Sequence, residues 1–573
     1  MKRIPYGISD YKQIRREDLY FVDKSMYLPV MEDEGHFLFL VRPRRFGKSI
    51  FLSMMHAYYD INERDNFDTL FDGLWIQQHP TPLRNTFEVL HLDFSQITGP
   101  FDKLADNVYS YLSIMIDDFA RRYASRYPEG YYEDVKKLDT GYAKLAYINQ
   151  AAKTCNHQMY LIIDEYDNFT NTVLNEKGEA VYRALTHGEG FYRDLFKQFK
   201  GNYNRILMIG VSPVTMDDVT SGYNIASNIS MKPQFNQMLG FSEDDVRQMI
   251  RYYQGEGKLK AEEESMIAEM KPWYDNYCFA RSVVYTDPKL FNCDMVCYYL
   301  MNVMQTGHSP EEMIDVNTRT DYTKMRKLIQ LDKLDGNRRS LLNQIAQDGG
   351  ITETLVPSFP ARDMALPENF VSLLFYYGML TIGGVFGAKQ KLIIPNNNVR
   401  KQYYDYLLRQ YQEIATVDIR ALSNAYDQAA INGDWQSMVR EIADVYKQTT
   451  SVRQLIEGER NLQGFMNAYL TLNPYYLTAP ELELNHGYCD FFLMPDMKRY
   501  PMIAHSYILE LKYLKKDDTE AVAAHQWQEA VKQIQGYAGA PIVQKMTDGT
   551  QLHLLVIQIR GYELFKAEEI GNG

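Results

Sequence analysis

Near its N-terminus the chain reads Phe37-Leu38-Phe39-Leu40-Val41-Arg42-Pro43-Arg44-Arg45-Phe46-Gly47-Lys48-Ser49. The apolar run at the start of this stretch is typical of a strand buried on both faces, and the residues from Ser49 to His56 are typical of a helix. Further apolar runs begin at Val89, Met159 and Ile206, and stretches with helical periodicity separate them. Alternating buried strands and helices predict a mostly parallel sheet with crossover connections, and therefore an α/β fold.

The composition is that of a folded protein with several domains. A length of 573 residues predicts roughly three or four domains, and 45% hydrophobic with 24% charged residues excludes wholesale disorder. The 61 Lys and Arg residues face 74 Asp and Glu residues, a net charge of −13, so any contact with nucleic acid depends on local basic clusters. The cysteines form no CxxC pair, the first residues lack a signal-peptide core, and no apolar run reaches the roughly 18 residues that cross a bilayer. These features predict a cytoplasmic protein with no membrane contact.

The basic turn after the first strand has the second half of a phosphate-binding loop. Such a loop wraps backbone N–H groups around a phosphate, while a Lys reaches the outer oxygens and a hydroxyl binds Mg²⁺. Gly47-Lys48-Ser49 supplies these groups, but Arg42 stands where a leading Gly is expected. We therefore expect a differently shaped loop in which Arg42, Arg44 or Arg45 adds charge at the phosphates. The alternative is a basic turn that only caps a helix.

Two later strands end in polar residues that fit the same site. The run from Met159 to Ile163 ends in Asp164 and Glu165, and the run from Ile206 to Val211 ends in Ser212. We expect Asp164 to hold Mg²⁺, Glu165 to polarise the attacking water and Ser212 to contact the γ-phosphate. The alternative for each is a strand that leaves the core with solvated polar residues.

These stretches, with Phe21-Val22-Asp23-Lys24-Ser25 and Leu92-Asp93-Phe94-Ser95, resemble the AAA-ATPase-like family of bacterial and archaeal proteins. In that family the Arg-Pro-Arg-Arg-Phe-Gly-Lys-Ser stretch is the usual P-loop. The resemblance implies ATP and Mg²⁺ as cofactors, with hydrolysis by extension. The residues expected to bind the nucleotide or its Mg²⁺ are Arg44, Arg45, Phe46, Gly47, Lys48, Ser49, Asp164 and Ser212; Glu165 is the expected catalytic residue.

A second constellation of charged residues lies near the C-terminus. Asp490 begins an apolar stretch, and the later strand-like run Tyr507-Ile508-Leu509-Glu510-Leu511-Lys512 places Glu510 and Lys512 on one face by its alternation. A hairpin would bring Asp490 near both. Two carboxylates for Mg²⁺ and a cation beside water are what metal-dependent phosphodiester hydrolysis needs. The alternative is a surface strand with a salt-bridged edge.

This region resembles the PD-(D/E)XK nuclease domain that commonly follows the AAA-like domain in this family. The resemblance implies a catalytic set of Asp490, Glu510 and Lys512 and metal ligation by Glu459, Asp490 and Glu510. Gln533 matches the helix after the core. The chain departs from the pattern at Leu462-Gln463, where a His or Tyr-His often follows the helical acid.

The whole chain is then expected to fold as α/β, with a P-loop NTPase (AAA-like) domain at residues 1–240. A helical, winged-helix-like middle region at 241–398 and a restriction-endonuclease-like α/β domain at 399–573 follow it. In the middle region, a Gly- and Pro-rich stretch at 349–367 predicts a long loop, followed by a helix near Phe370 and a hairpin from Leu380 to Pro395. In the last region we expect two strands around Pro495, a helix at 520–537 and a strand at 552–557.

The leading functional hypothesis is an ATP-binding, ATP-hydrolysing protein coupled to a Mg²⁺-dependent nuclease domain that acts on DNA or RNA. One alternative is a non-catalytic, ATP-dependent regulatory protein with a degenerate nuclease fold. Another is a sensor whose middle region recognises a protein partner. The sequence leaves open which nucleic acid is cut, whether the chain self-associates and whether hydrolysis and cleavage are coupled.

Overall fold

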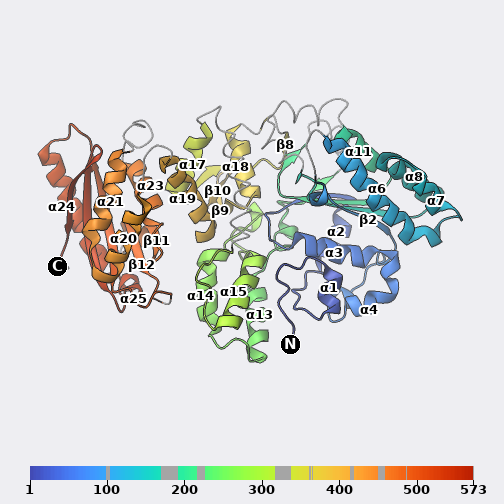
Figure 1. Cartoon of the computed structure of the whole chain (residues 1–573), viewed down its shortest axis with the longest axis horizontal. Helices are drawn as coiled ribbons and strands as arrows, with labels where there is room; N and C mark the ends of the chain where they lie inside the picture. Colours follow the sequence, from blue (N-terminus) through green and yellow to red (C-terminus); the bar gives the residue numbers. More distant parts are fainter. Residues whose placement is uncertain are drawn as a thin grey trace. The chain divides into compact units, whose positions relative to one another are not determined.

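The computed structural model describes residues 1–98, 103–168, 191–215, 226–315, 337–360, 363, 366–412, 418–448, 459–484, 487–497 and 499–571. The chain divides into two compact units, and Figure 1 labels many of their helices and some of their strands. The first unit comprises Met1–Leu341 and Gly350–Val399, and the second comprises Leu342–Gly349 and Arg400–Gly573.

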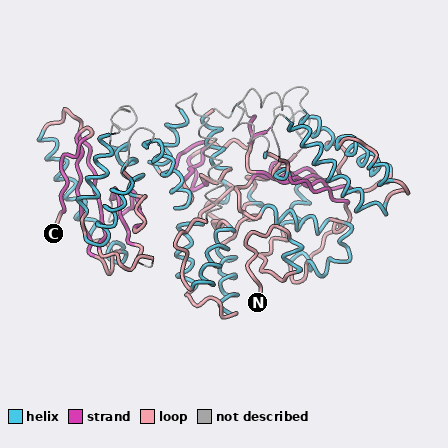
Figure 2. Tube along the Cα trace, viewed as in Figure 1, coloured by secondary structure: helices cyan, strands magenta, loops and turns pink. Residues whose placement is uncertain are grey.

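A five-stranded sheet lies in the first unit (Figure 2), with the strand order β2-β3-β4-β1-β6 and parallel pairing throughout. In that order the strands are Glu88–Asp93, Met159–Asp164, Arg205–Gly210, Phe37–Val41 and Ser227–Asn228. β3 is buried along its whole length, and β1 and β4 are buried at every residue except the first. The predicted parallel α/β architecture is confirmed, and it follows from strands that bury both faces.

Helices connect and flank these strands. The described helices of this part are α1 (Tyr11–Arg16), α2 (Tyr27–Glu34), α3 (Lys48–Tyr59), α4 (Phe67–Leu70), α5 (Trp75–Gln78), α6 (Leu104–Tyr123), α7 (Tyr131–Lys136), α8 (Gly141–Thr154) and α11 (Phe191–Phe199). The important connection is that from β1 to β2, because α3 begins directly after the basic turn.

A helical region follows the sheet in the same unit. It contains α13 (Glu243–Gly255), α14 (Glu263–Tyr274) and α15 (Cys293–Thr306), which share one apolar core. A capping box between Ser242 and Asp245 fixes the start of α13, because each side chain satisfies the backbone N–H of the other. The predicted helical middle region is confirmed here.

The helix and hairpin predicted after this region are also present. They are α18 (Pro367–Tyr376), β9 (Thr381–Phe386) and β10 (Lys389–Ile393). The prediction of a long loop at 349–367 is wrong in part, because β7 (Gly350–Glu353) adds an antiparallel strand to β10, and β8 (Phe359–Pro360) pairs with β5 (Val214–Thr215). A Cβ at Gly350 would lie 2.2 Å from the carbonyl oxygen of Leu392, so this glycine allows two strands to approach rather than marking a loop.

The second unit contains a five-stranded mixed sheet in chain order, β11 to β15. The strands are Tyr476–Leu484, Gly487–Pro495, His505–Leu514, Gln551–Arg560 and Glu563–Glu569. β13 and β14 are parallel and joined through α24 (Glu520–Ala538), and the other pairs are antiparallel. The predicted hairpin, helix and strand are confirmed, whereas β11 and β15 were not expected. Buried residues of α24 pack against β12 and β14.

The remaining described helices are α17 (Asn337–Asp348), most of which belongs to the second unit, α19 (Asn397–Gln412), α20 (Ile419–Asn432), α21 (Trp435–Gln448), α23 (Glu459–Leu470) and α25 (Pro541–Met546). Within the described ranges, the structure contains no helix with the length and hydropathy needed to span a lipid bilayer.

Candidate functional site

The basic turn between β1 and α3 has a backbone that a phosphate-binding loop requires. Gly47 has a φ of 85° and Arg45 a φ of 65°, both in the left-handed region. α3 then begins at Lys48, so the N–H groups of Lys48 and Ser49 lie at the start of the helix. These N–H groups have no acceptor within the helix and carry the positive end of its dipole, so this end of α3 attracts an anion.

Lys48 is buried and its side chain folds back over the turn. Its Nζ donates to the carbonyl oxygen of Pro43 at 2.8 Å and to that of Arg42 at 3.2 Å. Burial lowers the pKa of the Lys48 amine, and the carboxylates of Asp164 and Glu165 oppose that shift. A phosphate oxygen carries more negative charge than a carbonyl oxygen and would be a stronger partner for this ammonium group.

Ser49 and Asp164 meet at the end of β3. The Oγ of Ser49 donates to Oδ2 of Asp164 at 2.7 Å, and Oδ1 of Asp164 accepts from the backbone N–H of Glu165 at 2.9 Å. Burial raises the pKa of the Asp164 carboxyl, and the hydrogen bond from Ser49 and the charge of Lys48 oppose that rise. Glu165 itself has a left-handed φ of 48°, a strained backbone of the kind that clusters at functional sites.

The expectation that Arg42 adds charge at the phosphates is not supported by its position. Its guanidinium is buried, donates to the carbonyl oxygens of Val41, Ser230 and Phe235, and lies 4.2 Å from the ring centroid of Phe279. Arg42 therefore joins β1 to the segment after β6. Arg42 does not have a left-handed φ, so a glycine is not needed at its position.

The next residues of the turn hold it against the helical region. Arg45 forms an ion pair with Asp294 of α15, and Asp315 lies 3.9 Å from the same guanidinium nitrogen. Phe46 is buried between the rings of Tyr277 and Phe279, with centroids 4.9 Å and 5.6 Å away. Contacts with residues of the helical region therefore fix the turn, in addition to its own backbone conformation.

Ser212 lies at the end of β4, where Asp167 fixes its backbone. Oδ2 of Asp167 accepts from the N–H of Ser212 at 2.7 Å, and the same carboxylate accepts from the N–H of Val211 at 3.2 Å. The hydroxyl of Tyr166 donates to the carbonyl oxygen of Ser212. The ends of β3 and β4 are therefore held in register beside the basic turn.

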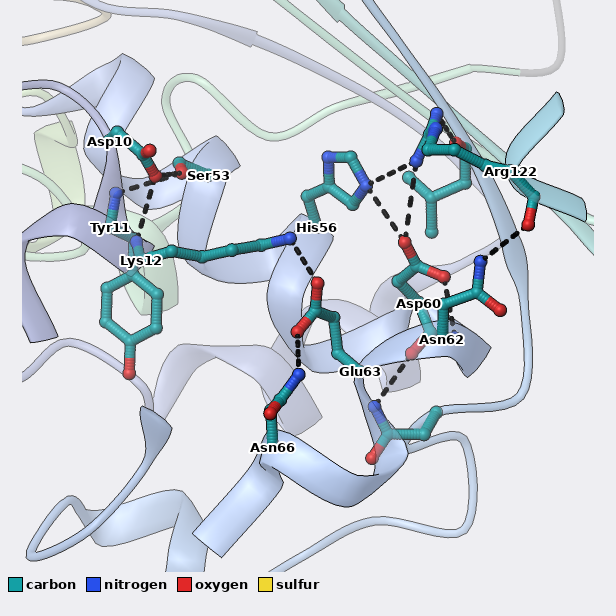
Figure 3. A network of polar contacts seen from close by, with 12 residues as sticks. Asp10, Tyr11, Lys12, Ser53, His56, Asp60, Asn62, Glu63, Asn66 and Arg122 are labelled. Carbon is teal, nitrogen blue, oxygen red and sulfur yellow. Dashed lines mark hydrogen bonds and ion pairs between the residues drawn. The ribbon is translucent and has the colours of Figure 1, made fainter. Parts of the chain in front are cut away.

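The far end of α3 is anchored by a polar network, which Figure 3 shows. Asp60 accepts from the N–H of Asn62 at 2.9 Å and lies 3.2 Å from Nε2 of His56 and 3.6 Å from Arg122. It also accepts from the hydroxyl of Tyr123 at 2.9 Å. Burial alone would raise the pKa of Asp60, but these hydrogen bonds outweigh it and lower the pKa. This network fixes the helix that carries Lys48 and Ser49.

A cavity of about 410 Å³ opens beside the turn. Residues of the basic turn and of the end of β3 line it, including Arg44, Gly47, Lys48, Ser49 and Glu165. Its lining also includes apolar residues such as Ile8, Phe21, Met238, Phe241, Met249 and Cys297. A cavity lined by both a basic turn and apolar side chains fits a nucleotide, whose phosphates are charged and whose base is flat and apolar on its faces.

In the second unit, β12 and β13 bring Asp490, Glu510 and Lys512 together. Oδ2 of Asp490 accepts from the N–H of Leu511 at 2.6 Å, and Nζ of Lys512 donates to Oε1 of Glu510 at 2.9 Å. Burial raises the pKa of both carboxyls, and for Glu510 the charge of Asp490 adds to the rise. Oε2 of Glu510 is buried and has no hydrogen-bond partner among the described residues. Two adjacent carboxylates with such an orphaned oxygen fit a cation.

The neighbouring helix α23 supplies a residue that the sequence reasoning missed. Nε2 of Gln463 donates to Oδ1 of Asp490 at 2.7 Å, so this amide orients the carboxylate. The departure from the family pattern at this position was visible in the sequence, but its contact was not. Glu459, one turn earlier, is exposed and lies 4.0 Å from Nζ of Lys512, while Gln533 is exposed on α24. No group of three or more Asp, Glu, His or Cys side chains within the described ranges is arranged to hold a metal ion. A hard cation here would therefore complete its shell with water or substrate oxygens.

The parallel sheet with its phosphate-binding turn defines a P-loop nucleotide-binding fold, and the mixed sheet with paired acids defines a nuclease-like fold. Residues 5–220 match the family described as a predicted AAA-ATPase, and residues 457–569 match the PD-(D/E)XK nuclease superfamily. The chain thus carries an AAA-ATPase-like domain and a PD-(D/E)XK superfamily domain, which confirms both resemblances. A protein of Azotobacter chroococcum mcd 1, named "Uncharacterized protein in vnfD 5'region", is 24% identical over 440 residues, which is 74% of each chain.

Proposed function

We propose that the first unit binds and hydrolyses ATP. One observation carries the proposal: the 2.7 Å hydrogen bond from Ser49 to Asp164, which joins the hydroxyl of the turn to the acid at the end of β3. In P-loop proteins these two groups hold Mg²⁺. Hydroxyl and carboxylate oxygens are the ligands that Mg²⁺ prefers, so the residues fit this ion.

Each residue of this site then has a distinct task. Lys48 and the first N–H groups of α3 bind the β- and γ-phosphates, and Arg44, which lines the same cavity, adds positive charge. Ser49 and Asp164 hold Mg²⁺, which neutralises phosphate charge when bound. Glu165 lines the cavity and accepts the proton of the attacking water. The apolar side chains that line the cavity receive the base.

Titration of ATP into the parent chain and into Lys48→Ala tests the first part of the proposal. We expect saturable binding to the parent and none to the variant, while Lys153→Ala, an exposed residue of α8, leaves the affinity unchanged. Equal affinity of the parent and Lys48→Ala would refute the assignment. Glu165→Gln should bind ATP normally but lose hydrolysis, because the amide cannot accept a proton.

We further propose that the second unit is a metal-dependent nuclease site. The buried oxygen of Glu510 without a described partner supports this proposal, because such an oxygen is expensive unless a cation binds it. Asp490 and Glu510 would hold Mg²⁺, whose chemistry is to polarise the phosphodiester and activate water. Lys512, held by Glu510, would place its ammonium beside the scissile phosphate and the water.

A non-catalytic second unit is the competing function. It is favoured by the fact that both oxygens of Asp490 already accept hydrogen bonds from the protein and that Lys512 pairs with Glu510. Titration with Mn²⁺ and cleavage of labelled DNA and RNA separate the two. The nuclease proposal expects metal binding and cleavage by the parent, and loss of both in Asp490→Ala. A parent chain that binds no metal supports the regulatory alternative.

A further inference from the structure

The helical region supplies one acid to the lining of the cavity beside the basic turn. Asp294 lies in the first turn of α15 and lines this cavity together with Arg45 and Lys48 of the basic turn. A carboxylate in a cavity that receives an anion repels that anion unless a cation neutralises the carboxylate. None of the tasks proposed above for the basic turn and for the end of β3 requires this acid.

Arg45 is the cation that neutralises Asp294. Its Nη1 donates to Oδ2 of Asp294, and Oδ2 of Asp315, in the segment after α15, lies 3.9 Å from the same nitrogen. The side chains of Arg45 and Asp294 are only 22% and 20% exposed, so solvent ions screen this ion pair incompletely. One guanidinium of the basic turn therefore serves two carboxylates that follow the start of α15.

Backbone hydrogen bonds hold the basic turn and the start of α15 in place independently of this ion pair. The carbonyl oxygen of Phe46 accepts from the N–H of Gly240 at 3.1 Å. Phe241 and Phe291 then exchange two backbone hydrogen bonds, of 3.1 Å and 2.7 Å, and the next residue, Asn292, caps α15 with its side chain. The arginine side chain can therefore change its partner while these backbone contacts persist.

A bound triphosphate would offer this guanidinium a second partner. Arg45 lines the same cavity as Lys48 and Ser49, which we propose bind the phosphates and their Mg²⁺. Arginine binds carboxylates and phosphates with the same planar set of N–H donors, so the two kinds of anion compete for it. Donors that turn to a phosphate leave Asp294, and its carboxylate then repels the phosphates.

We propose that Asp294 competes with the phosphates of ATP for Arg45, and that the helical region senses the nucleotide through this competition. The inference rests on the proposed binding of ATP. It adds that the ion pair lowers the affinity of the site for ATP and that bound ATP weakens the contact between the basic turn and α15. The two effects are equal in free energy, because coupling between two equilibria is reciprocal.

Asp294→Asn tests the competition directly. The variant should bind ATP about fivefold or more tightly than the parent, because an amide holds the guanidinium less strongly and does not repel phosphate. Calorimetric titration measures the Kd. Asp244→Asn is the matched control: Asp244 is exposed in the first turn of α13, so this variant loses the same charge outside the cavity lining, and its Kd should stay within twofold of the parent value. Unchanged or weaker binding by Asp294→Asn, or an equal rise in both variants, would overturn the proposal.

The same substitution in an Arg45→Gln background separates competition from simple repulsion. Repulsion between Asp294 and the phosphates does not need Arg45, so by itself it predicts that Asp294→Asn raises the ATP affinity by the same factor with and without the arginine. Competition predicts a smaller factor in the Arg45→Gln background, because the group for which Asp294 competes is gone. Equal factors in the two backgrounds would contradict the proposed role of Arg45.

Amide hydrogen exchange separates failure of this inference from failure of the proposed function. When ATP binds to the parent, exchange should slow at residues 47–49 and become faster at residues 296–300 of α15, and Asp294→Asn should not show the faster exchange. A parent that binds ATP while exchange in α15 stays the same or slows overturns the role of Asp294 and leaves the nucleotide site intact. A parent that binds no ATP overturns both.

Discussion

Gly378 lies directly against Pro43, at a separation that leaves no room for a side chain. The two residues belong to turns that end α18 and follow β1, and a Cβ on Gly378 would stand 2.9 Å from Cβ of Pro43. Protein interiors do not absorb an overlap of this size without movement, so any displacement of one turn is transmitted to the other. The position of the middle region and the shape of the basic turn after β1 are therefore linked.

Gly378→Ala should weaken ATP binding about tenfold or more, because the new methyl group pushes Pro43 and with it the turn that we propose binds phosphate. Calorimetric titration measures the change. Gly387→Ala is the matched control: Gly387 also has a left-handed φ, 56°, but nothing lies within 4 Å of its Cβ position. Both variants carry backbone strain, and only Gly378→Ala presses on the turn. Equal affinities in the two variants would contradict the link.

Arg42→Lys should destabilise the first unit by about 2–4 kcal/mol and leave the Kd for ATP within twofold of the parent. A lysine cannot reproduce a guanidinium that donates to the three carbonyl oxygens of Val41, Ser230 and Phe235. The change in stability is measured from the thermal unfolding transition whose midpoint rises when ATP is added, because that transition belongs to the first unit. If Arg42 contacted phosphate instead, the variant would bind ATP more weakly and its unfolding temperature would not change.

The sequence predicted the secondary structure correctly where a residue pattern is compatible with only one kind of element. The continuous apolar runs at β1, β3 and β4 admit only doubly buried strands, and Glu510 and Lys512 share a face because a strand alternates. Strand β15 was missed because its residues are almost all exposed or half-buried and show no apolar alternation. Strand β7 was missed because Gly350 was interpreted as a loop residue, although a neighbouring strand occupies the space beside it.

The site could be predicted less completely than the fold, because several of its contacts join residues that are distant in sequence. A sequence motif could predict Gly47, Lys48 and Ser49, because their arrangement depends only on the local backbone. The role of Gln463 depends on packing, because it reaches Asp490 from α23. The sequence left open which of Arg42, Arg44 and Arg45 adds charge at the phosphates, because a motif gives the charge of a side chain but not its direction.

Gln463→Leu should weaken divalent metal binding at the second unit by about tenfold to a hundredfold, the usual effect of removing a residue that orients a metal ligand. The amide donates to Oδ1 of Asp490 at 2.7 Å, and leucine has similar volume without the donor. Mn²⁺ titration measures the change. Gln533→Leu, which removes an exposed amide from α24, should have no effect. If the two variants behave alike, Gln463 does not support the site.

Asp275→Asn should stabilise the first unit at high pH and not at low pH. Asp275 follows α14, and its Oδ1 is buried without a hydrogen-bond partner among the described residues. Burial raises its pKa from 3.8 to about 6; the nearby charges of Lys271 and Lys289 oppose the rise, and that of Glu243 adds to it. The pKa of Asp275 is higher in the folded than in the unfolded protein. The carboxyl therefore lowers the free energy of unfolding least below about pH 4, where it is protonated in both states, and the protein loses this stability as the pH rises through 6.

Above pH 7 the ionised carboxylate of Asp275 therefore costs about 3 kcal/mol, the equivalent of roughly two pKa units. Asparagine keeps the shape and the acceptor oxygen without the charge, so the thermal transition of the first unit should rise at pH 8 and move little at pH 4.5. The exposed Asp72, changed to Asn, controls for the loss of one negative charge and should leave both transitions in place. An equal gain for Asp275→Asn at both pH values would show that the benefit comes from packing or hydrogen bonding, because a titrating carboxylate must lose its penalty when it is protonated.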